Sequence, residues 1–381
     1  MTSKQAILGG RDKVKVAIAQ VSNKYLDRDA SLTRAIEVIQ EAAANSAELV
    51  VFPEVWLAGY PYWTEGWDSH MPDWIDGRVR FHDAAIVIPS EDTERLAIAA
   101  RNADIHVVMG CNEMDARPGA QTIYNTLLFI GRDGKLLGKH RKLIPTFTER
   151  IFWGQGDSRD LAVFETDIGR IGGLICGENL MTTARAAMAA QGEHIHIAVF
   201  PGSFALHTGP KLEELDRDGY FWGNFAARSH AMEAGTFVIQ ACAYNDDADI
   251  PDDFPYKDKM NLEYAKGGSA VLSPLGVPLV EQQFGPQIIY AELQADMIKA
   301  VKAILDSVGH YDRPDILRLL VRREQGWQSA DTPYDPPELQ FDNEQLRRAA
   351  DRQDIDESLV YKIIDELNGP GEVDDKPPGG R

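Results

Sequence analysis

The sequence predicts an α/β fold, in which buried strands alternate with helices. Apolar runs of strand length recur from Val14 to Leu293, and helix-length segments with apolar residues three and four positions apart stand between them. Two turn signals, Asp133–Gly134 and Asp167–Gly169, occur where neighbouring strands have to be joined as hairpins. Because this alternation is typical of folds whose sheets are covered by helices, we expect an α/β or α/β/α layered architecture.

The predicted strands are short apolar runs that a sheet can bury between helix layers. In chain order they are Val14–Val21, Leu49–Pro53, His106–Met109, Asn125–Ile130, Leu161–Phe164, Ile171–Cys176, His194–Phe200, Phe237–Ala243, Ser269–Leu272 and Ile288–Leu293. The predicted helices are amphipathic, and each of them falls between two strands or after the last one. In chain order they are Asp29–Ala44, Ser90–Asn102, Asn179–Ala190, Asn224–Ala234 and Ala295–Asp306.

The length and the C-terminal composition describe the domain organisation. A chain of 381 residues suits two domains or one large α/β unit. From about Asp331 the composition changes, because segments such as DTPYDPPE and GPGEVDDKPPGGR are rich in proline, glycine and acidic residues. We therefore expect the C-terminal part to form an exposed arm with a disordered tip.

The charge balance excludes several classes of partner. The chain has 39 Lys and Arg against 59 Asp and Glu, a formal net charge of −20, which disfavours binding to nucleic acid. A hydrophobic content of 44% is too high for a disordered chain. Since no stretch approaches the ~18 continuous apolar residues of a spanning helix, we expect a soluble globular protein without a membrane partner.

The cysteines and the N-terminus indicate the compartment. Only three cysteines occur, at positions 111, 176 and 242, and this odd, sparse set argues for a reducing environment and against a disulfide framework. The opening MTSKQAILGGRDK lacks the apolar core of a secretory signal. Both observations favour a cytoplasmic location.

Glu54 is the first candidate for chemistry. It follows the apolar run LVVFP and therefore lies at the carboxyl end of a buried strand, where α/β sheets commonly place their sites. Partial desolvation against the aromatic loop VWLAGYPYW would raise its pKa towards that of a useful general base. A helix-capping or salt-bridged glutamate is the alternative, and the residues alone leave both interpretations open.

Cys176 is the candidate nucleophile. It ends the run RIGGLIC and precedes a predicted helix, so we expect the backbone N–H groups and positive end of that helix to lower its pKa and favour the thiolate. The alternative is a buried cysteine that behaves as a small hydrophobic residue. We assign Cys111 and Cys242 to packing, because Cys111 has no following helix and Cys242 lies inside the run VIQACAY.

Lys142 is the candidate cation. It lies in the basic segment KHRK, next to apolar Leu143 and Ile144, so it is the lysine of that segment most expected to point inward. A buried ammonium needs carboxylate partners, and Glu149 and Glu54 are the candidates. The alternative is a solvated basic hairpin.

Metal and cofactor motifs are weak or absent in the sequence. His194 and His196 alternate with isoleucines in EHIHIAVF, a spacing that suits two metal ligands but more often a hydrogen-bonded pair on a strand. Motifs of the types HExxH, CxxC, GxxxxGK[ST], strand-linked GxGxxG and GxSxG do not occur. The sequence therefore predicts no metal and no cofactor.

A glutamate at a strand end, a lysine after a hairpin and a cysteine at a strand-to-helix turn, in this order, resemble the Glu-Lys-Cys triad of the nitrilase (carbon–nitrogen hydrolase) superfamily. Further blocks resemble the same family in the expected order: AQVSNKYLDRDASLTRAIEVIQEAA, LVVFPEVWLAGYPYW, GKHRKLIPTFTERIFWGQGD, LAVFETDIGRIGGLICGEN, NFAARSHAMEAGTFVIQACAYN, GGSAVLSPLG and VGHYDRPDILRLLV. The blocks GYPYW, RKLIPTFTER with WGQGD, and GHYDRPD resemble the nitrilase branch rather than amidases or carbamoylases.

The resemblance implies a fold and a domain division. The fold is an αββα sandwich that pairs across a helix layer into an αββααββα homodimer, and many members assemble further into spirals. The matching blocks cover residues 14–322, which leaves residues 1–13 as an N-terminal extension and residues 323–381 as the C-terminal arm and acidic tail.

The resemblance also implies roles for individual residues. Cys176 becomes the nucleophile, Glu54 the general base and Lys142 the cation that stabilises the tetrahedral intermediates, while Glu149, in the matching TER block, orients Lys142 and helps to hold substrate. The implied reaction converts an organic nitrile to a carboxylic acid and ammonia through a thioimidate and a thioester, without a cofactor. Cyanide, amide or carbamoyl hydrolysis within the same superfamily, and a catalytically silent self-assembling scaffold, are the alternatives.

The block after the nucleophile departs from the family. It reads Cys-Gly-Glu-Asn instead of the usual Cys-Trp-Glu-Asn, and our hypothesis is that Gly177 opens space for bulky arylaliphatic or α-substituted nitriles. The aromatic segment after Glu54 is expected to line or cover the pocket, with an oligomer contact as the alternative. The predicted pocket residues are Tyr60, Trp63, Gly177, Glu178 and Phe204.

Overall fold

A computed structural model describes residues 6–64, 70–203 and 222–321 of the chain. These residues belong to the first of two compact units, which spans Met1–Gln328. The predicted pocket residue Phe204 and the whole of the expected C-terminal arm, residues 323–381, lie outside the described residues. Among the residues that are described, no helix is both long and apolar enough to cross a bilayer.

The first sheet is mixed and has the strand order β13-β1-β2-β4-β5-β6, with β3 paired to β4. Its parallel centre is formed by β1, β2 and β4, and β13, β5 and β6 extend it in antiparallel pairs. Its strands are β1 (Lys13–Gln20), β2 (Leu49–Val51), β3 (Ile86–Val87), β4 (His106–Met114), β5 (Ile123–Ile130), β6 (Leu136–Arg141) and β13 (Gln287–Gln294).

The second sheet has the order β12-β11-β10-β9-β8-β7. Here β8, β9 and β10 run parallel, and β7, β11 and β12 pair in antiparallel fashion at the two sides. Its strands are β7 (Phe164–Thr166), β8 (Gly169–Ile175), β9 (Ile195–Phe200), β10 (Phe237–Cys242), β11 (Gly267–Leu272) and β12 (Pro278–Phe284).

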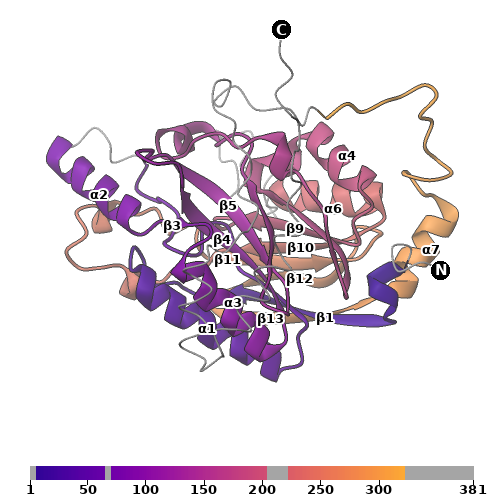
Figure 1. Ribbon diagram of the computed structural model, residues 1–381, viewed down its shortest axis with the longest axis horizontal. Helices are drawn as coiled ribbons and strands as arrows, with labels where there is room; N and C mark the ends of the chain where they lie inside the picture. Colours follow the sequence, from indigo (N-terminus) through magenta and orange to yellow (C-terminus); the bar gives the residue numbers. More distant parts are fainter. Residues whose placement is uncertain (1–5, 65–69, 204–221, 322–381) are drawn as a thin grey trace, which may run out of the picture. The chain divides into compact units, whose positions relative to one another are not determined.

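The described α-helices cover the outer faces of these sheets or flank them. They are α1 (Arg28–Ala44), α2 (Met71–Asp83), α3 (Glu91–Ala103), α4 (Thr182–Ala190), α6 (Trp222–Ala234) and α7 (Ala295–Ile304). Figure 1 shows α1 and α3 on one side of the stacked sheets and α4 and α6 on the other.

Period-two alternation along the strands builds the layers. On β1, Val16 and Ile18 face the core between the two sheets, whereas Ala17 and Ala19 face the core under α1 and α3. The inter-sheet core also includes Leu8, from the short 3₁₀ turn Ile7–Gly10, so part of the N-terminal extension is packed into the domain. The predicted α/β class and the αββα sandwich are confirmed, and the αββααββα dimer stays a prediction.

Most predicted elements are present, and both predicted hairpins are confirmed. Asp133–Gly134 joins the antiparallel strands β5 and β6, and Asp167–Gly169 joins β7 and β8. The sequence reasoning missed α2, β3, β6 and β12, which carry charged or half-exposed side chains and therefore lack a clear apolar period.

Several predicted boundaries are wrong, and the strand predicted at His106–Met109 extends to Met114. The strand predicted at Leu161–Phe164 lies at Phe164–Thr166, because Leu161 packs against α4 instead of pairing with a neighbouring strand. The helix predicted from Asn179 begins only at Thr182. A 3₁₀ turn, Cys176–Leu180, precedes it, and the Asn179 amide within this turn donates to the backbone carbonyls of Leu174 and Cys176.

Candidate active site

Lys142 lies at the centre of a buried ion cluster. It follows β6, and its ammonium donates to Glu54 Oε1 at 3.0 Å and to Glu149 Oε2 at 2.7 Å. The side chains of Lys142 and Glu54 are inaccessible to solvent, and that of Glu149 is 4% exposed. Burial lowers the pKa of Lys142, but the attraction of Cys176, Glu149 and Glu54 outweighs this and raises it well above its ordinary value, so the ammonium form is favoured.

Glu54 reaches this cluster from the carboxyl end of β2. The chain can pass close to β4 there only because residue 110 is glycine, since a Cβ at Gly110 would lie 2.0 Å from the carbonyl oxygen of Pro53. Glu54 Oε1 accepts from Lys142 and from Asn125 Nδ2 at 2.7 Å, whereas its buried Oε2 has no hydrogen-bond partner among the described residues. One carboxylate oxygen is therefore left for a reacting group.

Burial sets the acidity of Glu54. Desolvation raises its pKa to about 7, a rise that Lys142 opposes and the charge of Glu149 reinforces. A carboxyl group with a pKa near 7 can both accept and return a proton at neutral pH, which is the property of a general acid–base catalyst. The desolvation that the sequence analysis expected is therefore present.

Glu149 is fixed by three donors. It lies in the 3₁₀ turn Phe147–Ile151, where the backbone N–H of Thr146 donates to Oε2 at 2.7 Å alongside Lys142. The hydroxyl of Tyr60 donates to Oε1 at 3.0 Å. Since both oxygens are occupied, Glu149 is placed to orient the ammonium of Lys142 rather than to transfer protons.

Cys176 completes the constellation from the second sheet. It follows β8 with a left-handed φ of +52°, unusual for a residue other than glycine. Its Sγ and one carboxylate oxygen each from Glu54 and Glu149 all lie within 4.8 Å of one another. This turn brings the thiol to the Glu54 and Glu149 carboxylates.

The expected depression of the Cys176 pKa is wrong. Burial raises the pKa of this thiol well above its ordinary value, and the neighbouring carboxylates add to the rise that Lys142 opposes. The helix expected to stabilise a thiolate begins only at Thr182, so its positive end does not lie at the sulfur. Burial therefore favours the neutral thiol form of Cys176.

The Glu178 side chain is buried beside the Cys176 turn. Its Oε1 accepts from the backbone N–H of Leu143 at 2.7 Å, and its Oε2 accepts from Ile175 N at 2.8 Å. The imidazole of His140 lies 2.9 Å from the same Oε2, and burial opposes the pKa rise that Glu178 causes in His140. Both oxygens are thus used to join the Cys176 turn to the Lys142 segment, which favours positioning over substrate contact.

The other predicted pocket residues differ in their surroundings. Tyr60 contacts Glu149 and lies at the site. Trp63 is completely buried in an aromatic cluster, where it stacks on Tyr256 and donates from Nε1 to the hydroxyl of Tyr25. Gly177 is partly exposed beside the Cys176 turn. The structure thus brings Tyr60 and Gly177 to the site and places Trp63 in the packing behind the aromatic loop.

His194 and His196 have separate partners. His194 Nδ1 accepts from the backbone N–H of Arg170 at 3.2 Å, whereas His196 contacts Glu193 and Asn179. The two histidines are therefore hydrogen-bonded individually. Among the site residues that sequence reasoning missed, Asn125 had a detectable signal, because it is a polar residue at the start of the apolar run NTLLFI.

Comparison with known sequences gives the family. The family model described as carbon-nitrogen hydrolase matches residues 15–303. Nitrilase 2 of Arabidopsis thaliana is 36% identical over 319 residues, which cover 81% of this chain and 88% of that protein. The aliphatic nitrilase of Rhodococcus rhodochrous is 36% identical over 318 residues, with 81% of this chain and 79% of that protein covered. These relatives support nitrile hydrolysis.

Comparison with solved structures gives the same fold. The chain is similar to Saccharomyces cerevisiae Nit3, a member of branch 10 of the nitrilase superfamily, with a TM-score of 0.60 and 25% identity, covering 79% of this chain and 97% of that one. A carbon-nitrogen hydrolase from Helicobacter pylori superposes with a TM-score of 0.61 at 19% identity, covering 80% and 97%. The chain belongs to the carbon–nitrogen hydrolase family, in its nitrilase branch, and is a hydrolase that acts on carbon–nitrogen bonds.

Proposed function

We propose that the protein hydrolyses an organic nitrile to the carboxylic acid and ammonia, with Cys176 as the nucleophile. The observation that carries the proposal is the buried cluster in which the Cys176 thiol lies beside Glu54, Lys142 and Glu149. A nitrile carbon is a weak electrophile, so its attack needs a soft nucleophile, a nearby base and a cation for the charge that develops on nitrogen.

The first half of the reaction forms a carbon–sulfur bond. As Sγ attacks the nitrile carbon, Glu54 Oε2 accepts the thiol proton and the ammonium of Lys142 donates a hydrogen bond to the nitrogen. Glu54 returns the proton to that nitrogen, which gives a neutral thioimidate. Because Oε2 has no other partner among the described residues, it is free for this proton cycle.

The second half consumes two waters. One water, activated by Glu54, adds to the thioimidate carbon; the tetrahedral intermediate, stabilised by Lys142, then expels ammonia and leaves a thioester. A second water attacks the thioester through the same base, and the acid leaves as the Cys176 thiol is restored. One nitrile and two waters thus become one carboxylic acid and one ammonia.

Ammonia release from matched substrates tests this function. Phenylacetonitrile, 2-phenylpropionitrile, a short aliphatic nitrile, the corresponding amides and cyanide would be compared at equal concentration, with acid and amide products separated by chromatography. We expect the nitriles to be the best substrates and the acid to be the main product. Faster turnover of the amides or of cyanide than of every nitrile would contradict the proposal and favour the alternative activities.

The pH profile tests the base. Because Glu54 must be deprotonated to accept the thiol proton, kcat/KM is expected to fall about tenfold per pH unit below its pKa of about 7. The Asn125 hydrogen bond lowers that pKa, so Asn125→Ala should move the acid limb to higher pH. An acid limb at the ordinary carboxyl value of 4.5 in both proteins would exclude Glu54 as the titrating base.

Gly177 bears on the substrate class, which we propose to be arylaliphatic or α-substituted nitriles. A Cβ at position 177 would lie 2.9 Å from the hydroxyl of Thr146, with its next neighbour at 3.9 Å, so a side chain there meets mainly that hydroxyl. Thr146 in turn holds Glu149 through its backbone N–H. A bulky residue at 177 would therefore fill space beside Cys176 and press on the turn that carries Glu149.

Gly177→Trp is expected to shift the kcat/KM ratio of phenylacetonitrile to a short aliphatic nitrile downward by about tenfold, because the indole removes room for the aryl group. Gly177→Ala is the matched control, since one methyl group displaces only the Thr146 hydroxyl, and a shift of about threefold or less is expected. A ratio that stays at the wild-type value in Gly177→Trp would refute the role assigned to this glycine.

A further inference from the structure

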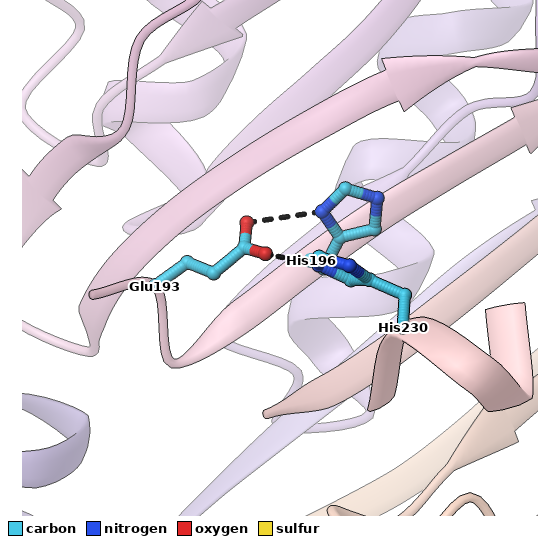
Figure 2. A group of neighbouring side chains, drawn as sticks. All are labelled: Glu193, His196 and His230. Carbon is cyan, nitrogen blue, oxygen red and sulfur yellow. Dashed lines mark hydrogen bonds and ion pairs between the residues drawn. The ribbon is translucent and has the colours of Figure 1, made fainter. Parts of the chain in front are cut away.

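A second buried polar cluster lies behind the nucleophile turn. It consists of Glu193, in the turn before β9, His196 on β9 and His230 on α6, all at most 1% exposed (Figure 2). None of these side chains belongs to the cluster around Lys142. Burying a carboxylate and two imidazoles is unfavourable unless these groups are paired, so the partners of each group matter.

The cluster is continuous with the Cys176 turn. Glu193 Oε2 lies 3.0 Å from His196 Nδ1, and its Oε1 is hydrogen-bonded to His230 Nε2, as the dashed lines in Figure 2 show. His196 Nε2 lies 3.2 Å from Asn179 Oδ1. A chain of hydrogen bonds thus runs from α6 through β9 to Asn179, three residues after the nucleophile.

Asn179 is hydrogen-bonded to backbone carbonyls on both sides of the Cys176 side chain. Its Nδ2 donates to the carbonyl of Leu174 at 3.2 Å and to the carbonyl of Cys176 at 3.1 Å. Cys176, in the left-handed conformation, lies in the backbone segment that these two hydrogen bonds hold. Such a conformation persists only when the surrounding structure holds it, so these two hydrogen bonds help to determine the direction of the thiol.

The bonding partners determine where the protons lie. The two carbonyls can only accept, so Asn179 turns its amino group towards them and its oxygen towards His196 Nε2. Burial raises the pKa of Glu193, but the two imidazoles outweigh this and hold it at about 2, so Glu193 accepts from His196 Nδ1. The His196 ring thus links a carboxylate to an amide, and burial lowers its pKa against the opposing attraction of Glu193.

The separations favour hydrogen bonds over a metal centre. Zinc bound at about 2.1 Å in a tetrahedral site holds its ligand atoms about 3.4 Å apart. In this cluster the carboxylate and imidazole atoms are at hydrogen-bonding separations, with one carboxylate oxygen for each ring. The cluster is therefore already satisfied as a proton-bearing network.

We propose that Glu193, His196 and Asn179 are positioning residues that hold the Cys176 turn in its left-handed conformation, with His230 fixing Glu193. The network acts through the backbone of residues 174–176 and touches no substrate. It keeps Sγ within reach of Glu54 and Lys142 as the thiol attacks. This inference rests on the proposed role of Cys176 as the nucleophile.

The test measures the reactivity of Cys176 directly. His196→Leu removes both hydrogen-bonding nitrogens and substitutes an apolar side chain of similar size, and we expect kcat to fall about 10- to 100-fold with KM within about threefold. The alkylation rate of Cys176 by iodoacetamide, followed by mass spectrometry of its peptide, should fall in parallel. Alkylation needs no nitrile, so it still reports positioning of the thiol if nitrile hydrolysis itself is refuted.

Two comparisons separate positioning from general damage. Loosening of the fold would speed alkylation of the buried Cys111 and Cys242, whereas lost positioning slows Cys176 alone. His106→Leu is the matched control: His106 is 4% exposed and lies 2.7 Å from Asp167, but it stands at the amino end of β4, whereas Glu54 follows the carboxyl end of the neighbouring parallel strand β2. It should lower stability and leave both rates within about twofold.

Glu193→Gln is the second variant, because it keeps the size of the side chain and removes the negative charge that pairs with both imidazoles. We expect it to lower kcat and the Cys176 alkylation rate about tenfold, including where His196→Leu does not fold. Alkylation of Cys176 at the wild-type rate in folded Glu193→Gln would overturn the proposal. A stoichiometric, zinc-dependent rise in the unfolding temperature of the wild-type protein would also overturn it and assign the cluster to a metal.

Discussion

Replacing Cys176 with alanine is expected to lower ammonia release from phenylacetonitrile by at least about 10³-fold. The thiol lies within 4.8 Å of the Glu54 and Glu149 carboxylates, and the neighbouring Lys142 carries its nitrogen as an ammonium, which has no free electron pair for the attack. Cys176→Ser should lose a similar factor, because a hydroxyl is a poorer nucleophile towards a nitrile and a buried one is no easier to deprotonate.

Stability should change little in the same variant. A φ of +52° is about equally unfavourable for alanine and for cysteine, and only one sulfur atom is removed. We therefore expect the free energy of unfolding to change by about 1 kcal/mol or less. Cys111→Ala is the control, since Cys111 is fully buried and packs in the core under α1 and α3. Equal ammonia release by the wild-type protein and Cys176→Ala would show that the assigned nucleophile is wrong.

Lys142→Met is expected to remove activity by at least about 10³-fold and to destabilise the fold at the same time. The methionine fills much of the space of the lysine but leaves Glu54 and Glu149 buried together without their shared cation. Removing one partner from a buried ion pair typically destabilises the folded state by about 3–5 kcal/mol. Urea-induced unfolding of the variant would measure this loss.

The loss of stability should depend on pH. Without the ammonium, burial and repulsion by Glu149 raise the pKa of Glu54 in the folded state further above that in the unfolded chain. The folded state then binds more protons, so the stability of Lys142→Met is retained at acidic pH and falls as pH rises through the ordinary carboxyl range and above. Unfolding should be compared at pH 5.5 and pH 8.

Lys139→Met is the matched control for this prediction. Lys139 lies three residues away on β6 and donates to the buried Glu113 at 2.5 Å. Glu113 also accepts two hydrogen bonds from Arg141, so it keeps a cation when the lysine is lost. We expect a smaller loss with little dependence on pH. An equal, pH-independent loss in both variants would contradict the electrostatic role assigned to Lys142.

The sequence was informative about the fold because the apolar periods are regular where elements are buried. On β1 and β5 nearly every residue is inaccessible, and these strands lie within about two residues of the predicted ranges. The prediction failed where a strand is held by charges: β6 carries Lys139, His140 and Arg141, whose partners Glu113 and Glu178 lie far away in the chain. No local pattern records such pairings.

The sequence by itself determined the layered α/β class and the residue types that the chemistry needs, because apolar periodicity and turn residues are local properties. Only the tertiary structure decided how these residues act. It joins Glu54 to Lys142 across 88 positions, adds Tyr60 and Asn125, and places Asn179 against the His196–Glu193 pair. It also reversed the expected acidity of Cys176, since desolvation depends on what surrounds a group in space and not on its neighbours in the chain.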